Sequence, residues 1–171
     1  QEVVEDYFMD RPIIPDSVRS EVKAKYLYDS AWSIINAPSC TMYPERCDYL
    51  VQKYGPDDNF MEAKKENLIE FQKRTGLTIN PDAILFFWPS RLDPFQKGVE
   101  LLEDIAQQFV NQYQDAQIAI VADGIGNERT HQEILGRLAC ASGGRIAYQP
   151  FSEELSMLGY AAANDVFGAS L

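Results

Sequence analysis

Histidine and cysteine are scarce in this sequence, and their scarcity excludes several kinds of site. The single histidine of the 171-residue chain, His131, excludes metal sites and proton relays built from several histidines, and it leaves one residue on which a Ser-His-Asp triad could be built. The three cysteines, Cys40, Cys47 and Cys140, are odd in number and contain no C-x-x-C pair. They favour neither a disulfide framework nor a common zinc site, and they predict a reducing, cytoplasmic location.

Basic charge and long hydrophobic runs are lacking as well. Lysine and arginine total 15 against 26 aspartates and glutamates, a net charge of −11 that opposes binding to nucleic acid. No apolar run approaches the roughly 18 residues of a membrane helix, and the acidic start at residues 1–6 is unlike a signal peptide. With 46% hydrophobic residues, the chain is expected to form one compact, soluble domain without a nucleic-acid or membrane partner.

A regular alternation of apolar runs, turns and amphipathic stretches begins at residue 83. Residues 83–88 form a continuous apolar run that is typical of a strand buried on both faces. Further strands are expected at 117–122, 145–148 and 165–168, with helices between them. The inward faces of the first two helices are predicted to comprise Val99, Leu102, Ile105, Ala106, Phe109 and Tyr113, and then Ile134, Leu135 and Leu138. The sequence therefore predicts an α/β fold over residues 83–171, a Rossmann-like parallel sheet with helices on both faces.

Residues 1–82 are less regular and are expected to contain a partly helical connector and the start of the domain. Helical character is confined to 17–28 and 61–74, while 33–35 could form a lone strand. The charged residues 64–66 and His131 are expected on solvated helix surfaces. Because the chain stops just after the fourth strand, before the next ligand-binding loop of an open α/β sheet, we expect it to be truncated at its C-terminal end.

The segment after the first strand carries the strongest candidate site. Arg91 and Lys97 lie six residues apart on a strand-to-helix connection, where two cations can converge on one anion beside the free N–H groups of a helix N-terminus. A diphosphate fits this arrangement. The alternative is that both are ordinary solvated charges, one of them paired with Asp93. The position at the carboxyl end of a strand favours ligand binding.

Two further turns are weaker candidates. Gly124 and Gly126 follow the second strand, but the third glycine of a dinucleotide-binding fingerprint would fall at Arg129. Their loop is either a simple turn or a place where the backbone approaches a ligand. Phe151 follows the third strand and could stack on a base. An aromatic residue there could instead pack before a helix that is capped by Ser152.

Four ordered segments of the chain match one known set of motifs. Ser90-Arg91-Leu92 followed by Gln96 to Leu102 is similar to R-L-x-x-Q-K-G-x-(D/E)-L-(I/L), with one extra residue between the halves. Phe151 to Ser156 is similar to G-Y-x-E-x-L-(A/S)-H, with Met157 in place of the histidine, and 159–171 is similar to the stretch that follows it. Lys64 to Leu77 is similar to K-x-x-N-K-x-x-L-Q-x-x-x-G-L, with Asn67 and Gln72 in register. Together these segments resemble the bacterial glycogen synthases and plant starch synthases.

The resemblance implies the carboxyl-terminal, nucleotide-sugar-binding domain of the two-domain GT-B fold. Such enzymes transfer glucose from ADP-glucose or UDP-glucose to an α-1,4-glucan acceptor with retention at the anomeric carbon, and they require no metal or other cofactor. Carried over residue by residue, Arg91 and Lys97 are the catalytic and substrate-binding residues that hold the donor diphosphate. Phe151 stands where the family has a tyrosine that stacks on the base. Gly124 and Gly126 match a glycine-containing loop.

The resemblance also implies missing parts. The family's N-G-(I/V)-D segment is present only as Asn36-Ala37-Pro38-Ser39, the E-P-(C/F)-G loop would fall after Leu171, and the amino-terminal domain with its K-x-G-G loop is absent. The isolated chain is therefore expected to bind nucleotide weakly at most and to have no meaningful transferase turnover. Two alternatives stay open: another retaining GT-B glycosyltransferase, such as a sucrose-synthase-like enzyme, and a non-catalytic α/β binding module.

Overall fold

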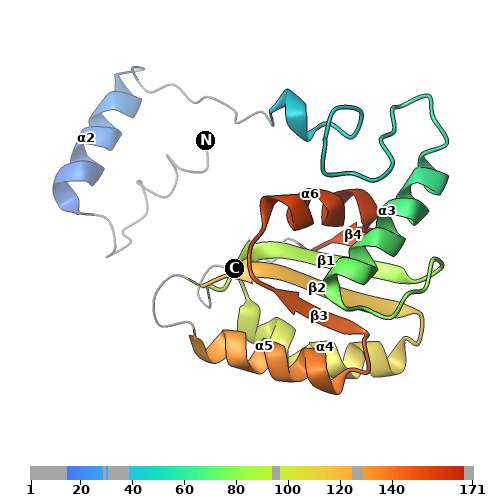
Figure 1. Ribbon diagram of the computed structural model, residues 1–171. Helices are drawn as coiled ribbons and strands as arrows, with labels where there is room; N and C mark the ends of the chain where they lie inside the picture. Colours follow the sequence, from blue (N-terminus) through green and yellow to red (C-terminus); the bar gives the residue numbers. More distant parts are fainter. Residues whose placement is uncertain (1–14, 29, 31–38, 94–96, 125–128, 168–171) are drawn as a thin grey trace. The chain divides into compact units, whose positions relative to one another are not determined.

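The computed structural model describes residues 15–28, 30, 39–93, 97–124 and 129–167 (Figure 1). The chain divides into two compact units, residues 1–38 and 39–171. In the first unit, helix α2 spans Asp16–Leu27 and has no buried residue, in agreement with the helix predicted at 17–28. The possible strand at 33–35 lies outside the described residues. No helix within the described ranges is long and apolar enough to cross a bilayer.

The second unit is built on a four-stranded parallel sheet with strand order β3-β2-β1-β4. The strands are β1 (Ile84–Arg91), β2 (Ala116–Asp123), β3 (Ile146–Gln149) and β4 (Asp165–Val166). The helices are α3 (Phe60–Thr75), α4 (Val99–Gln112), α5 (Arg129–Ala141) and α6 (Glu153–Ala162), and a short 3-10 helix, η1, spans Cys40–Met42. The predicted α/β fold with a parallel sheet is thus confirmed.

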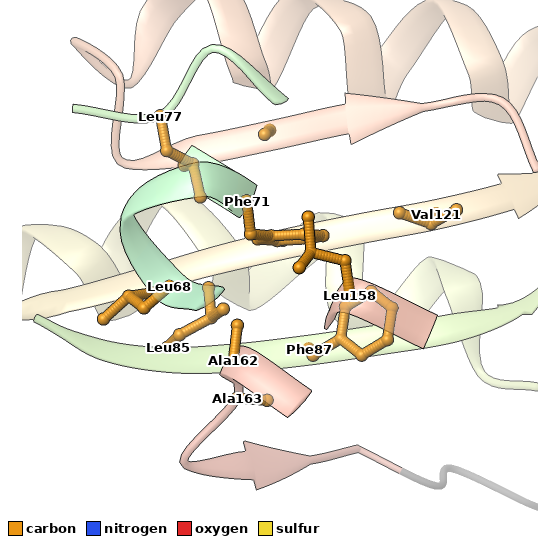
Figure 2. Packing of buried hydrophobic residues seen from close by; sticks show 11 residues of the cluster. Leu68, Phe71, Leu77, Leu85, Phe87, Val121, Leu158, Ala162 and Ala163 are labelled. Atoms are coloured by element: carbon orange, nitrogen blue, oxygen red, sulfur yellow. The ribbon is translucent and has the colours of Figure 1, made fainter. Parts of the chain in front are cut away.

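Helices cover both faces of this sheet. Helices α3 and α6 pack on one face, where Figure 2 shows Phe71 and Leu158 meeting Leu85 and Phe87 of β1. The rings of Phe71 and Phe87 meet edge to face with centroids 5.6 Å apart, a favourable arrangement for two aromatic side chains. Helices α4 and α5 cover the other face through a second cluster that includes Trp88, Val99, Leu102, Ala106, Val110, Ile118, Ile120 and Leu135. Burial on both faces explains why β1 and β2 are almost continuously apolar.

The first strand is longer than the sequence predicted. It continues through Pro89 and Ser90 to Arg91, although proline cannot donate a hydrogen bond to a neighbouring strand. On the side away from β2, the described pairing with β4 covers Phe86 and Phe87, and within residues 129–167 it does not reach Pro89. The missing N–H of Pro89 therefore interrupts none of the pairing that the structure describes. Arg91, expected in the connection, is in fact the last residue of the strand.

The buried face of α4 also differs from the prediction. Val99, Leu102 and Ala106 are buried as expected, but Ile105 and Tyr113 are 47% and 51% exposed. Val110 is fully buried in their place. The buried residues of α4 recur every three or four positions, at 99, 102, 106 and 110, as one face of a helix does. The face that contacts the sheet is therefore narrower than the full set of apolar residues on this helix would suggest.

Two polar side chains that were expected in solvent, those of His131 and Lys64, each contact a second element of the fold. The Nδ1 atom of His131 on α5 lies 2.9 Å from a carboxylate oxygen of Glu103 on α4, and each of these side chains is at most 15% exposed. The ammonium group of Lys64 on α3 donates a hydrogen bond to the carbonyl of Ala163, and burial lowers the pKa of this lysine. The expectation of solvated surfaces was wrong for these two residues, because each one bridges two elements.

Buried amides on α3 anchor loops that sequence patterns leave undefined. Asn67 is fully buried, and its side-chain oxygen accepts hydrogen bonds from the N–H groups of Val51 and Gln52 at 3.0 and 3.2 Å. Its amide nitrogen donates to the carbonyl of Gln52 at 2.9 Å. The segment 50–52, which has no regular structure, is thereby fixed to α3.

Gln72, also fully buried, connects α3 to the sheet. Its amide nitrogen donates to the side chain of Gln117 on β2 at 2.9 Å and to the carbonyl of Asn80 at 2.8 Å, while its oxygen accepts from the N–H of Asn80 at 3.0 Å. Gln117 in turn donates to the carbonyl of Thr78 at 2.6 Å. Helix α3 therefore shares one core with the strands.

Candidate functional site

A groove opens at the carboxyl ends of the central strands. It has a volume of about 580 Å³ and is lined by Met42, Pro89, Ser90, Arg91, Lys97, Phe151, Glu153, Ser156, Met157 and Tyr160. Parallel strands bring their carboxyl ends to the same edge of the sheet, so loops that are far apart in sequence meet there. Of the five residues singled out in the sequence, three line this groove: Arg91, Lys97 and Phe151.

Arg91 at the end of β1 and Lys97 in the connection that follows both lie before the start of α4. The N–H of Asp93 donates to the carbonyl of Arg91 at 2.8 Å, and the N–H of Lys97 donates to the carbonyl of Asp93 at 2.9 Å. Gly98 then begins the helix in the left-handed conformation, at φ 61°, which glycine adopts without the strain other residues incur. Arg91 is exposed and Lys97 half-exposed, so both can meet an anion near the N-terminus of α4.

The connection after β3 presents an aromatic ring. The side chain of Phe151 is 59% exposed, so its ring is not part of the core. The N–H of Phe151 donates to Oδ1 of Asp123 at the end of β2, with a separation of 3.0 Å. Ser152 caps α6 by accepting a hydrogen bond from the N–H of Leu155 at 3.3 Å, as the sequence predicted. The ring is therefore held at the edge of the groove by a defined backbone.

The glycine loop after β2 contributes less. Gly124 directly follows β2 and is half-buried, but it is not among the residues that line the groove. Gly126 lies outside the described residues. Gly124 is therefore the one of the two glycines whose position can be compared with Arg91, Lys97 and Phe151, and it lies outside their groove.

Helix α6 provides groove residues that sequence reasoning missed. Glu153, Ser156, Met157 and Tyr160 all face the groove. Their spacing of three and four residues places them on one side of a helix, and this pattern just after Phe151 could have identified them. Met42, by contrast, comes from η1, and no signal in the sequence connects it with the strands.

The groove has a mixed electrostatic character. Arg91 and Lys97 supply positive charge, while Glu153 at the first turn of α6 supplies negative charge. Tyr148, on the neighbouring strand β3, is not a groove residue, and its hydroxyl donates to the carbonyl of Ala122 at 3.3 Å. Burial raises the pKa of Tyr148, and the negative charge of Asp123 adds to this increase. Such a site suits a ligand that carries an anionic group together with hydroxyl groups that can donate to a carboxylate.

An apolar hollow adjoins the groove. It has a volume of about 270 Å³ and shares Met42, Met157 and Tyr160 with the groove. The remaining lining residues are Pro44, Cys47, Leu50, Tyr54 and Ala161. Within the described part of the chain, no group of three or more histidine, cysteine, aspartate or glutamate side chains could hold a metal ion.

Comparison with known proteins identifies relatives of one kind. The chain is 34% identical over 132 residues to a glycogen synthase of Nitrosospira multiformis, covering 77% of this chain and 25% of that protein. It is 31% identical over 143 residues to glycogen synthase 1 of Synechocystis sp., covering 83% of this chain and 28% of that protein. No family model matches the sequence.

The fold has a counterpart among solved structures. The catalytic domain of starch synthase IV from Arabidopsis thaliana, solved with ADP and acarbose, superposes with a TM-score of 0.73 at 19% sequence identity. The match covers 92% of this chain and 32% of that one, and at this identity it shows the fold alone. Sequence and fold together thus assign the chain to the glycogen and starch synthase family of GT-B glycosyltransferases, and its matched part covers about a quarter of the length of its curated relatives.

Proposed function

We propose that this chain is the donor-binding part of a glycogen or starch synthase. The complete enzyme would transfer glucose from ADP-glucose or UDP-glucose to an α-1,4-glucan, with retention at the anomeric carbon. One observation carries the proposal: the groove at the carboxyl ends of the strands gathers two cations and an exposed aromatic ring from two separate loops. A nucleoside diphosphate sugar has the matching parts, an anionic diphosphate and a flat base.

The two cations have a chemical role in this proposal. Breaking the bond between glucose and the diphosphate leaves additional negative charge on the leaving group. Fixed positive groups that are already in place stabilise this charge most strongly as the bond breaks. Arg91 and Lys97, together with the N-terminus of α4, would perform this task.

The other predicted residues would bind the nucleoside. Phe151 offers an exposed ring on which a base could stack, without the hydroxyl that a tyrosine would add. The loop that contains Gly124 and Gly126 would let the backbone approach the ligand from the end of β2. A cytoplasmic location, in keeping with three free cysteines, is part of the same proposal.

We further propose that the isolated chain binds nucleotide without catalysing transfer. The chain spans 25% and 28% of its curated relatives, and the acceptor glucan and the partner domain of a two-domain cleft belong to the larger protein. Sustained glucose transfer by the 171-residue chain alone would contradict this part of the proposal.

Calorimetric titration of the chain with ADP, UDP and NAD tests the donor site. We expect binding of ADP or UDP, and Lys97→Ala should weaken it by about tenfold or more, since a hydrogen bond to a charged group contributes about 1.5–3 kcal/mol. Lys65→Ala is the matched control, because Lys65 pairs with Asp82 on the other side of the domain from the groove residues. Absence of ADP and UDP binding, or selective binding of NAD, would refute the proposed donor site.

A further inference from the structure

We propose that Asp123 is a positioning residue that holds Phe151 ready to receive the nucleoside. The inference rests on the proposed function and goes beyond it, because Asp123 neither lines the groove nor belongs to the motifs that identify the family. Its place at the end of the central strand β2 puts it between the two loops that supply the groove.

Asp123 contacts both loops, but through different atoms. Its backbone carbonyl accepts a hydrogen bond from the N–H of Leu92 at 3.0 Å, which continues the pairing of β1 with β2 beyond Arg91. Its side-chain Oδ1 accepts from the N–H of Phe151, also at 3.0 Å. The cationic loop is therefore held by the backbone of Asp123, and the aromatic loop by its carboxylate.

The carboxylate contact matters because the Phe151 side chain is largely exposed. Its side chain is 59% exposed, so packing does not fix the ring before a ligand arrives. A loop that is ordered only on binding loses conformational freedom at that moment, which weakens affinity. A carboxylate that accepts a backbone N–H orders the loop in advance, and this gain applies only to ligands that contact the ring.

The negative charge of Asp123 acts in the opposite direction. A carboxylate at the end of β2, in register with Arg91, repels an incoming diphosphate. Asp123→Asn removes the charge and keeps an oxygen that can accept from Phe151, whereas Asp123→Ala removes both. Comparing the two variants therefore isolates the hydrogen bond from the charge.

Calorimetry on the 171-residue chain with ADP, UDP and inorganic pyrophosphate tests the proposal. We expect Asp123→Ala to bind ADP and UDP about three- to tenfold more weakly than Asp123→Asn, as the loss of one hydrogen bond implies. The two variants should bind pyrophosphate equally, since the Leu92 contact survives in both. In a Phe151→Ala background the difference between the variants should disappear. Equal nucleotide affinities of the two variants would overturn the proposal.

A second measurement, made without a ligand, tests whether Asp123 positions Phe151. Amide hydrogen exchange at Phe151 should be several-fold faster in Asp123→Ala than in the parent chain, and Asp123→Asn should restore protection. Equal exchange in all three proteins would overturn the positioning role. If the parent chain binds no nucleotide and protection at Phe151 still depends on Asp123, the donor site fails while the positioning of Phe151 stands.

Discussion

Two of the regions that match the synthase motifs, helix α3 and the groove, differ in how far their polar residues are exposed. On α3, the motif residues Asn67 and Gln72 are fully buried. Their side-chain amides bond to backbone groups of nearby loops, and that of Gln72 also bonds to a side chain of β2. At the groove, Arg91 is exposed and Lys97 half-exposed. The same kind of sequence signal thus marks two different tasks.

The physical difference is where each group finds its partner. A buried amide costs free energy unless the protein itself satisfies it, so Asn67 and Gln72 serve the folded state. An exposed cation costs little while it is hydrated and becomes valuable when a ligand replaces the water. Substitutions on α3 should therefore change stability, and substitutions at the groove should change ligand chemistry.

The largest effect is expected from Arg91→Ala in the complete synthase. Loss of one preorganised positive group should lower kcat/KM by more than a hundredfold, about 3 kcal/mol of transition-state stabilisation, with little change in Tm. Steady-state kinetics with the nucleotide sugar provide the measurement. Arg137→Ala, at an exposed position on α5, is the control. A large fall in Tm with unchanged kcat would mean that Arg91 contributes to stability, as Asn67 and Gln72 do, and not to catalysis.

Gln72→Leu should show the reverse pattern. The substitution leaves Asn80 and Gln117 without the partners they have now, and each buried unsatisfied group costs about 1–3 kcal/mol. We expect a loss of about 2–4 kcal/mol in the free energy of unfolding, measured by urea denaturation. Gln108→Leu, at an exposed position on α4, should be nearly neutral. Similar urea denaturation midpoints for Gln72→Leu and Gln108→Leu would show that the Gln72 contacts contribute little to stability.

Gly159→Ala tests the packing of α6 on β1. Helix α6 supplies several of the residues that line the groove. A Cβ atom there would lie 2.5 Å from Cζ of Phe87, far inside normal contact. We expect a loss of about 1–3 kcal/mol in unfolding free energy from overpacking. Gly136→Ala on α5 meets no atom within 4 Å and should stabilise the chain by about 0.5–1 kcal/mol. In one urea denaturation series, we expect the free energy of unfolding to fall for Gly159→Ala and to rise for Gly136→Ala.

Much of the fold could be predicted because its signals are local. The apolar runs of β1 and β2 and the Ser152 cap each depend on neighbouring residues, and each prediction is confirmed. The extension of β1 through Pro89 was missed because it depends on tertiary pairing with β2, where Pro89 lies opposite Val121. The contact of Lys64 with Ala163 was missed for the same reason, since 99 residues separate the partners.

The candidate site could be predicted only in part. Arg91, Lys97 and Phe151 were found because each follows a recognisable strand and matches a motif. Met42 and the Asp123 contact with Phe151 had no such signal, because tertiary packing alone brings them to the groove. The roles of Asn67 and Gln72 were hidden for a related reason: a motif records that a residue is retained, not whether it faces the core or a ligand.

The smallest effect is expected from the surface ion pairs of Arg74, one within α3 and one with α6. Arg74 bonds to Glu70 at 2.8 Å and also to Glu154, and its hydrogen bond to Glu70 holds the pKa of that carboxyl below its ordinary value of 4.5. A lowered folded-state pKa gives stability that is present above pH 4.5 and is lost as the pH falls through the folded value. Glu70→Gln should therefore lower stability slightly at neutral pH and flatten the acid side of the stability profile, as measured by urea denaturation across the acid range. Because Arg74 is exposed and Glu70 is half-exposed, salt should erase most of the effect of Glu70→Gln. A large, salt-resistant loss in Glu70→Gln would mean that this surface of α3 contributes to stability as its buried amides do.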